Sequence, residues 1–180
     1  MQVTPTAIPD VKLIEPKVFG DARGFFFESY NRRSFSIAGL DAEFVQDNHS
    51  RSHRGVLRGL HYQIEHAQGK LVRVIAGVVF DVAVDLRRGA PTFGEHVAIE
   101  LSADNKRLLW IPPGFAHGFI VVSEAAEFAY KASDYWYPEH ERTLLWNDPA
   151  LRIRWPLVGT PVVAPRDAAG SPLAVAETYP

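Results

Sequence analysis

The feature of this 180-residue sequence that most constrains its fold is a series of short apolar runs rich in Val, Ile, Phe and Tyr. Gly, Pro or Asn interrupts them about every 8–12 residues, as in all-β domains. The 3.6-residue period of an amphipathic helix is nearly absent, and we expect one short helix at 34–38, ended by Gly39. Strands are expected at 12–18, 24–30, 43–49, 55–63, 70–76, 78–86, 93–101, 107–111, 116–122 and 126–133.

The length of 180 residues predicts a single domain, residues 1–180. So many short strands in one core imply a sandwich, a jelly roll or a barrel. Gly77, between two adjacent runs, predicts a tight hairpin turn. The absence of cysteine excludes a disulfide scaffold, a thiolate zinc site and a cysteine nucleophile.

Charge and hydropathy limit the partners that we expect. The formal net charge of -2 supplies no cationic field to hold nucleic acid. No run of 18 apolar residues appears, because Arg73 and Asp81 interrupt the best candidate, 72–84. The first residues show no cationic start and no apolar block of the kind a signal peptide has. We therefore expect a cytoplasmic protein with no nucleic-acid or membrane partner.

Strand alternation places several polar side chains on one face or the other. In the run 126–133, Tyr130 shares a face with Phe128 and Ala132, so we expect it to point inward. In the run 78–86, Asp81 shares a face with Asp85. Two carboxylates on one face indicate either a solvated surface or a polar interior, and both interpretations stay open at this point.

The densest polar segment is 51–63, which contains several arginines and His61. It fits an anionic small-molecule site better than a nucleic-acid patch, since arginine forks suit phosphate oxygens. A solvated strand with scattered charges is the simpler alternative. Strict alternation puts Arg58 and His61 on opposite faces, although a bulge at Gly59 could re-aim one of them.

A second segment, 110–119, has the Pro-x-Gly-x-x-His spacing that resembles the second motif of cupins, which are small jelly-roll barrels. Metal-binding cupins supply His-x-His in their first motif, whereas the corresponding stretch here, 61–63, has a single histidine. A transition-metal site usually needs three good protein ligands. His61 and His117 alone make a metal cupin, either a dioxygenase or an isomerase, the weaker hypothesis.

Nine motifs in order make the whole chain informative: DARGFFFE at 21–28, VQDNHS at 45–50, GVLRGLHYQ at 55–63, QGKLVR at 68–73, FDVAVDLR at 80–87, PPGFAHGF at 112–119, YK at 130–131, WNDP at 146–149 and IRWP at 153–156. From about residue 10 to Asp167 the chain resembles the dTDP-4-dehydrorhamnose 3,5-epimerase family. The resemblance implies an all-β, cupin-type jelly-roll barrel with short peripheral helices. It also implies a nucleotide-sugar substrate, no cofactor, no metal, and a homodimer in which N-terminal segments cross between subunits.

The resemblance also implies roles for individual residues. His61 is similar to the family's general base, Asp167 to the carboxylate that pairs with it, and Tyr130 to the general acid. Lys70 matches a lysine near the developing oxyanion and Asp81 a buried supporting acid. The positions that match substrate contacts are Arg23, Glu28, Gln46, Asp47, Asn48, Arg58, Lys70, His117, Glu141 and Arg166.

These residue types suit an epimerase. Loss of the hydrogen next to a C4 ketone gives an enolate, and inversion needs a base on one face of the sugar and a proton donor on the other. A histidine can accept the proton and a tyrosine can donate one, while a lysine can stabilise the enolate oxygen. We expect epimerisation at C3 and C5 of a dTDP-4-keto-6-deoxy sugar, with a C3-only epimerase or a catalytically silent nucleotide-sugar binder as alternatives.

Three positions depart from the family pattern. Trp136 stands where many members have a second tyrosine, and Arg166 stands where they usually have a lysine. The loop between His61 and Lys70 is one residue shorter than the common pattern. Trp136 and the short loop lie beside positions that would touch the sugar, so they bear on which ring carbon meets the base.

Overall fold

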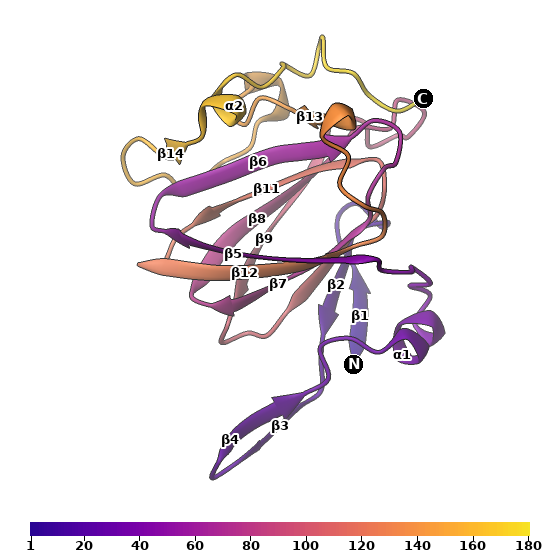
Figure 1. Ribbon diagram of the computed structural model, residues 1–180, viewed down its shortest axis with the longest axis vertical. Helices are drawn as coiled ribbons and strands as arrows, with labels where there is room; N and C mark the ends of the chain where they lie inside the picture. The colour runs from indigo at the N-terminus through magenta and orange to yellow at the C-terminus, as the bar shows by residue number, and fades with distance from the viewer.

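Two antiparallel sheets carry the fold of the computed structural model, which describes residues 1–180 (Figure 1). The first sheet has the order β1 (Gln2–Pro5), β2 (Lys12–Glu15), β10 (Leu108–Ile111), β7 (Lys70–Ala76), β12 (Ala125–Ala132) and β5 (Gln46–His53). The second has the order β13 (Glu141–Thr143), β6 (Val56–Gln63), β11 (Phe115–Val121), β8 (Val78–Asp85) and β9 (His96–Ser102), with β14 (Val162–Val163) parallel to β6. The expected all-β jelly-roll barrel is confirmed.

The main core lies between the two sheets, as alternation along each strand requires. Its 15 buried residues include Val72 and Phe128 from the first sheet and Ala83 and Phe119 from the second. A second cluster, which includes Leu60 and residues of the C-terminal segment, covers the outer face of the second sheet. That sheet is therefore packed on both faces, which gives the side chains of β6 and β11 a rigid support.

Gly59 allows β6 and β11 to approach each other closely. A Cβ atom on Gly59 would lie 2.6 Å from Gly118 Cα and 2.6 Å from His117 O, and the φ of Gly59 is +113°. The strand register shifts at this point, since His61 pairs with His117 while Arg58 pairs with Phe119. The irregularity that the sequence allowed at Gly59 is thus present, and it lets Arg58 and His61 face the same cavity.

The prediction of a tight hairpin at Gly77 is wrong. Gly77 does have a left-handed φ of +77°, but β7 before it belongs to the first sheet and β8 after it to the second. The chain therefore turns a corner between sheets instead of reversing within one. The backbone of Ala125, the first residue of β12, lies against this corner. A Cβ atom on residue 77 would lie 2.0 Å from Ala125 O, so only glycine fits at this position.

Helices and edges account for the remaining differences. Helix α1 (Arg32–Ile37) begins two residues before the expected start, because the side chain of Asn31 caps the N–H groups of Arg33 and Ser34. The sequence analysis missed β1, β13, β14 and helix α2 (Pro165–Ala168), all short and peripheral. The strand expected at 12–18 ends at Glu15, and a separate strand, β3 (Val18–Asp21), begins at its last residue. Two 3-10 turns, Pro138–His140 and Pro149–Leu151, complete the chain. No helix is long and apolar enough to cross a membrane.

A two-stranded hairpin of β3 (Val18–Asp21) and β4 (Gly24–Phe27) pairs with neither large sheet. Figure 1 shows it projecting from the body, away from the C-terminal segment. Three of its phenylalanines, Phe19, Phe25 and Phe26, are more than half exposed. Within a single chain, the apolar side chains of this hairpin therefore remain largely exposed.

Candidate active site

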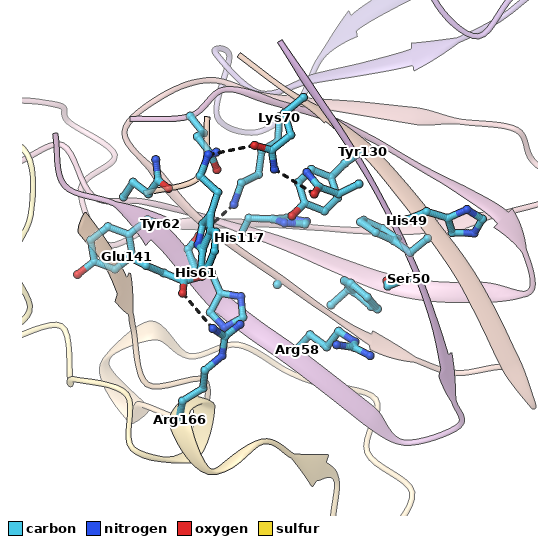
Figure 2. A pocket seen from close by; sticks show the side chains of 18 residues that line it. His49, Ser50, Arg58, His61, Tyr62, Lys70, His117, Tyr130, Glu141 and Arg166 are labelled. Atoms are coloured by element: carbon cyan, nitrogen blue, oxygen red, sulfur yellow. Dashed lines mark hydrogen bonds and ion pairs between the residues drawn. The ribbon is translucent and has the colours of Figure 1, made fainter. Parts of the chain in front are cut away.

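A cavity of about 410 Å³ opens between the two sheets. Figure 2 shows side chains from both walls pointing into it. The residues lining it are Gln46, Asn48, His49, Ser50, Arg58, His61, Tyr62, Gln63, Gln68, Lys70, His117, Gly118, Phe119, Phe128, Tyr130, Trp136, Glu141 and Arg166. Nine of them are positions that the sequence analysis marked as site residues, drawn from segments more than 100 residues apart.

His61, on β6, is held by a carboxylate from the far end of the chain. Its Nε2 lies 2.6 Å from Oδ1 of Asp167, a residue of helix α2. The second carboxylate oxygen accepts a hydrogen bond from the Gly59 N–H at 3.1 Å. The His61 side chain remains 20% exposed whereas Asp167 is 3% exposed, so the imidazole faces the cavity and the carboxylate stays behind it.

The environment of Asp167 keeps it ionised. Burial alone would raise its pKa, but the hydrogen bond to His61, reinforced by Gly59 and by the charge of Arg166, holds the pKa below its usual value. An ionised carboxylate can only accept, so Nε2 of His61 carries the proton. In the neutral imidazole, Nδ1 then has the free lone pair that a general base requires.

Lys70 and Tyr130 come from neighbouring strands of the opposite sheet, β7 and β12. Lys70 is buried, and this lowers its pKa to about 8, although the charges of Glu141 and Asp81 oppose the shift. Its Nζ donates to the backbone oxygen of His61 at 3.3 Å. Burial, with a contribution from the negative charge of Glu141, raises the pKa of Tyr130, so its phenol stays protonated at neutral pH. The prediction that Tyr130 points inward is confirmed.

A second histidine–carboxylate pair includes His117, which also lines the cavity. His117 Nε2 on β11 lies 2.9 Å from Asp81 Oδ2 on the adjacent strand β8. Asp81 is fully buried, and its other carboxylate oxygen has no hydrogen-bond partner. Of the two interpretations of the Asp81 face, the polar interior is confirmed, because Asp85 is fully buried as well and pairs with Arg87.

Cationic groups gather at one end of the cavity. Arg58 donates through Nε to Ser52 Oγ at 2.9 Å, which leaves its terminal nitrogens directed at the cavity. Arg166 pairs with Glu141 Oε2 at 2.9 Å (Figure 2). Arg166 also lies 3.4 Å from Asp167 Oδ1. Guanidinium groups in this arrangement can bind the oxygens of a diphosphate.

Three of the expected substrate contacts lie outside this cavity. Arg23 is at the exposed tip of the β3–β4 hairpin, where it pairs with Asp21. Glu28 bonds to Asn31 beside helix α1. Asp47 points away from Gln46 and Asn48 along β5 and pairs with Lys131 on the outer face of the sheet. Within one chain these three residues do not join the group around His61.

Other lining residues were not singled out from the sequence. Gln63 follows His61 by two positions on β6, and Ser50 follows Asn48 by two on β5. Each pair shares a face because alternate residues of a strand point the same way. The two-residue period of a strand could therefore have identified Gln63 and Ser50 from the sequence. It does so only where the boundaries of the strand are already known.

The side chains at this site do not form a typical metal centre. No group of three or more His, Asp or Glu side chains is arranged to hold a metal ion. Each of the two cavity histidines is instead paired with a single carboxylate. The cavity offers proton-transfer groups, cationic groups and the exposed indole of Trp136.

Known proteins resemble this chain over nearly its whole length. Residues 5–174 match the family model described as dTDP-4-dehydrorhamnose 3,5-epimerase. The dTDP-4-dehydrorhamnose 3,5-epimerase of Pseudomonas aeruginosa is 64% identical over 181 residues, covering 100% of both chains. A dTDP-6-deoxy-D-glucose-3,5-epimerase from Legionella pneumophila Philadelphia 1, solved with dTDP-4-keto-L-rhamnose, matches with a TM-score of 0.95 at 52% identity, covering 98% of this chain and 94% of that one.

A 3'-monoepimerase from Streptomyces bikiniensis, solved with dTDP-quinovose, is also similar. It matches with a TM-score of 0.89 at 33% identity, covering 94% of this chain and 87% of that one. The shared architecture therefore extends to proteins described as acting at one centre. With a family model over most of the chain and a relative at 64% identity over its full length, this chain belongs to the dTDP-4-dehydrorhamnose 3,5-epimerase family of isomerases.

Proposed function

We propose that this protein epimerises C3 and C5 of dTDP-4-dehydro-6-deoxy-D-glucose to give dTDP-4-dehydro-L-rhamnose, through an enolate formed by proton transfer. The observation that carries the proposal is the arrangement of two groups on opposite sheets. His61 on β6, held by Asp167, faces a cavity whose other wall presents the protonated Tyr130 on β12. A sugar between them would meet a base on one face and an acid on the other.

The first step removes a proton from the carbon next to the ketone. Nδ1 of His61 takes the proton, and the electron pair of the broken C–H bond forms the C=C bond of an enolate whose charge rests on O4. The ammonium group of Lys70 can stabilise that oxygen. Asp167 stabilises the imidazolium that forms and keeps the ring oriented.

The second step returns a proton to the opposite face of the same carbon. Tyr130 donates its phenol hydrogen, the C=C electrons form the new C–H bond, and the ketone is restored with inverted configuration. His61 then carries an extra proton and Tyr130 is a phenolate. Its raised pKa makes this phenolate a strong base that regains a proton readily. Because both groups reset by exchange with water, the new hydrogen comes from solvent.

Hydrogen exchange tests this proposal directly. Incubation with dTDP-4-keto-6-deoxyglucose in deuterium oxide, followed by NMR, should show deuterium at both C3 and C5 and an L-configured product. Absence of exchange at both carbons would leave a nucleotide-sugar binder. Activity that chelators abolish would instead point to a metal-dependent cupin.

Arg58 supports binding of the diphosphate through charge-assisted hydrogen bonds. Because these contacts are the same in ground and transition states, Arg58→Ala should raise KM more than it lowers kcat. A loss confined to kcat, with unchanged binding of free dTDP, would contradict this role.

A C3-only epimerase is the second candidate, and Trp136 is the observation that favours it. Its side chain is 52% exposed on the cavity wall, and an indole carries a donor N–H but no acidic hydroxyl. Double epimerisation requires the intermediate to reposition beside the same base. Time-resolved deuterium incorporation decides between the candidates: label confined to C3 after long incubation with excess enzyme would favour the C3-only enzyme.

We also propose that a second copy of this chain is the partner. The β3–β4 hairpin exposes Phe19, Phe25 and Phe26 by 53%, 63% and 71%, and a contiguous apolar surface of this kind is typical of an interface. Arg23 and Glu28, which lie at and just after the hairpin, would then join the cavity of the other subunit. Light scattering should give twice the chain mass of 20.1 kDa, and Phe25→Ser with Phe26→Ser should shift the protein to the monomer.

Mixing two impaired variants, assayed at a substrate concentration well below KM, tests whether Arg23 acts across the interface. Arg23→Ala weakens substrate binding in the cavity of the other subunit, whereas His61→Asn removes the proposed base from its own cavity. A one-to-one heterodimer therefore contains one complete site, so a random mixture should recover about a quarter of wild-type turnover. If Arg23 acted within its own chain, each heterodimer would contain one site that lacks Arg23 and one site that lacks His61, so mixing would recover no activity.

A further inference from the structure

Gln63 is a buried amide beside the proposed base. It is the last residue of β6, two positions after His61, and only 3% of its surface is exposed. An amide removed from water needs hydrogen-bond partners for both its N–H₂ group and its oxygen. The partners of Gln63 therefore indicate what the residue does at this position.

All three hydrogen bonds of the Gln63 side chain go to the backbone of two loops. Nε2 donates to the carbonyl oxygen of His66 at 2.8 Å and to that of Tyr135 at 3.1 Å. Oε1 accepts from the N–H of Tyr137 at 2.8 Å. Both amide hydrogens are used, so the side chain has no donor left for a ligand in the cavity.

One of these loops, residues 133–137, carries Trp136 on the cavity wall. Gln63 bonds to the residue before Trp136 and to the residue after it, while the Trp136 N–H itself donates to Gln46 Oε1 on β5 at 3.0 Å. Two glutamines, one from each sheet, thus bind the two consecutive peptide groups on either side of Trp136. This fixes the backbone from which the indole projects.

The other loop is the short connection from β6 to Lys70. Glu65 and His66 in it have positive φ values of 52° and 47°, a conformation that costs energy for non-glycine residues. The Gln63 bond to the His66 carbonyl stabilises that conformation. The His66 ring in turn stacks on Tyr137, with ring centroids 4.1 Å apart. The two loops are therefore held together through Gln63.

We infer that Gln63 is a positioning residue: it sets the affinity of the cavity for its ligand by fixing the segment that carries Trp136, without touching the ligand itself. The inference rests on the proposed function only in taking a dTDP-linked ligand as the occupant. Gln63 would thus act on the ligand only through the position of Trp136.

The variant Gln63→Met keeps the length and removes all three hydrogen bonds. The Kd for dTDP, measured by calorimetry, should rise about tenfold, as for other residues that support a binding group. KM should rise similarly while kcat changes little, because His61, Lys70 and Tyr130 keep their own supports. Should this variant not fold, Gln63→Glu keeps the length and the acceptor for Tyr137 but loses both donors, and it carries the same expectation.

Asn105 provides a matched control. Its side chain also makes three hydrogen bonds to backbone groups, accepting from Ser102 and Arg107 and donating to Glu100, in a turn outside the cavity. Asn105→Leu should lower Tm as Gln63→Met does but leave the Kd for dTDP unchanged. If both variants weakened dTDP binding equally, Gln63 would have only a general structural role.

A double-mutant cycle with Trp136→Ala isolates the route of the effect. If Gln63 acts through Trp136, Gln63→Met should change the Kd by less than about twofold once the indole is gone, although its effect on Tm should persist. Additive effects on Kd, or an unchanged Kd in the single variant, would overturn the inference. Failure of the wild-type protein to bind dTDP would count against the proposed function instead.

Discussion

The cavity contains two histidine–carboxylate pairs that are similar in composition but differ in their surroundings. The Asp167 carboxylate bonds to His61 and Gly59 and lies beside Arg166, so both its oxygens have partners. The Asp81 carboxylate is fully buried, and one of its oxygens has no partner. A histidine with a fully satisfied carboxylate behind it is suited to change its charge during a reaction.

The two histidines differ in the same way. The His61 side chain is 20% exposed and that of His117 is 7% exposed. His117 also stacks on Phe128, with ring centroids 5.9 Å apart, and pairs with an aspartate from the adjacent strand. The comparison supports the proposal that the first pair moves protons, while the second places a negative charge near Lys70.

Replacing the base should have the largest effect. His61→Asn cannot accept the substrate proton, so exchange at C3 and C5 and overall turnover should both fall about 10³-fold. Tm and dTDP affinity should stay near wild type, because the side chain lies at the cavity edge. Near-normal deuterium exchange in this variant would show that the two pairs have been assigned the wrong roles.

Asp167→Asn should be severe but milder. The imidazole keeps a hydrogen-bond partner of similar size but loses the charge that stabilises its cation, so kcat should fall about 10²-fold. Steady-state measurements of kcat for both variants should show a smaller loss for Asp167→Asn than for His61→Asn. A kcat equal to that of wild type would mean that the carboxylate serves only to attach helix α2.

Asp81→Asn should have a smaller effect, about tenfold on kcat, since in the proposed mechanism this carboxylate supports His117, which does not transfer a proton. It should also change the pH profile. The negative charge of Asp81 raises the pKa of Lys70, so its removal should lower that pKa and shift the alkaline fall in rate to lower pH. A profile identical to that of wild type would show that Asp81 does not influence Lys70.

The smallest effect is the pH dependence of the wild-type enzyme itself. Burial lowers the pKa of Lys70 to about 8. The cation that we propose to stabilise the enolate is therefore lost as pH rises through that value, and kcat should fall. Lys70→Arg stays charged and should lack this fall. Since Lys70 in the unfolded chain titrates near 10.5, the unfolded state binds more protons between these values, and stability should rise with pH across that window. A fall in rate that persists in Lys70→Arg would assign it to another group.

The sequence by itself determined most of the strands and the faces of some of their residues. Alternation along the run 126–133 put Tyr130 inside, and the apolar runs between turn residues located most of the strands that the structure contains. These features depend on neighbouring residues only, since the two-residue period of a strand is local. The ordered motifs added the family and its candidate residues.

Only the tertiary structure decided how those residues are arranged. The family resemblance implied that Asp167 pairs with His61, but only the structure shows that helix α2 brings Asp167 to His61 across 106 positions of the chain. Gly77 connects two sheets instead of forming a hairpin, and Arg23 lies away from the cavity of its own chain. Each of these depends on which strands pair and on how distant segments pack. Non-local pairing is set by the burial of the whole core and not by any local period, so no window of the sequence contains it.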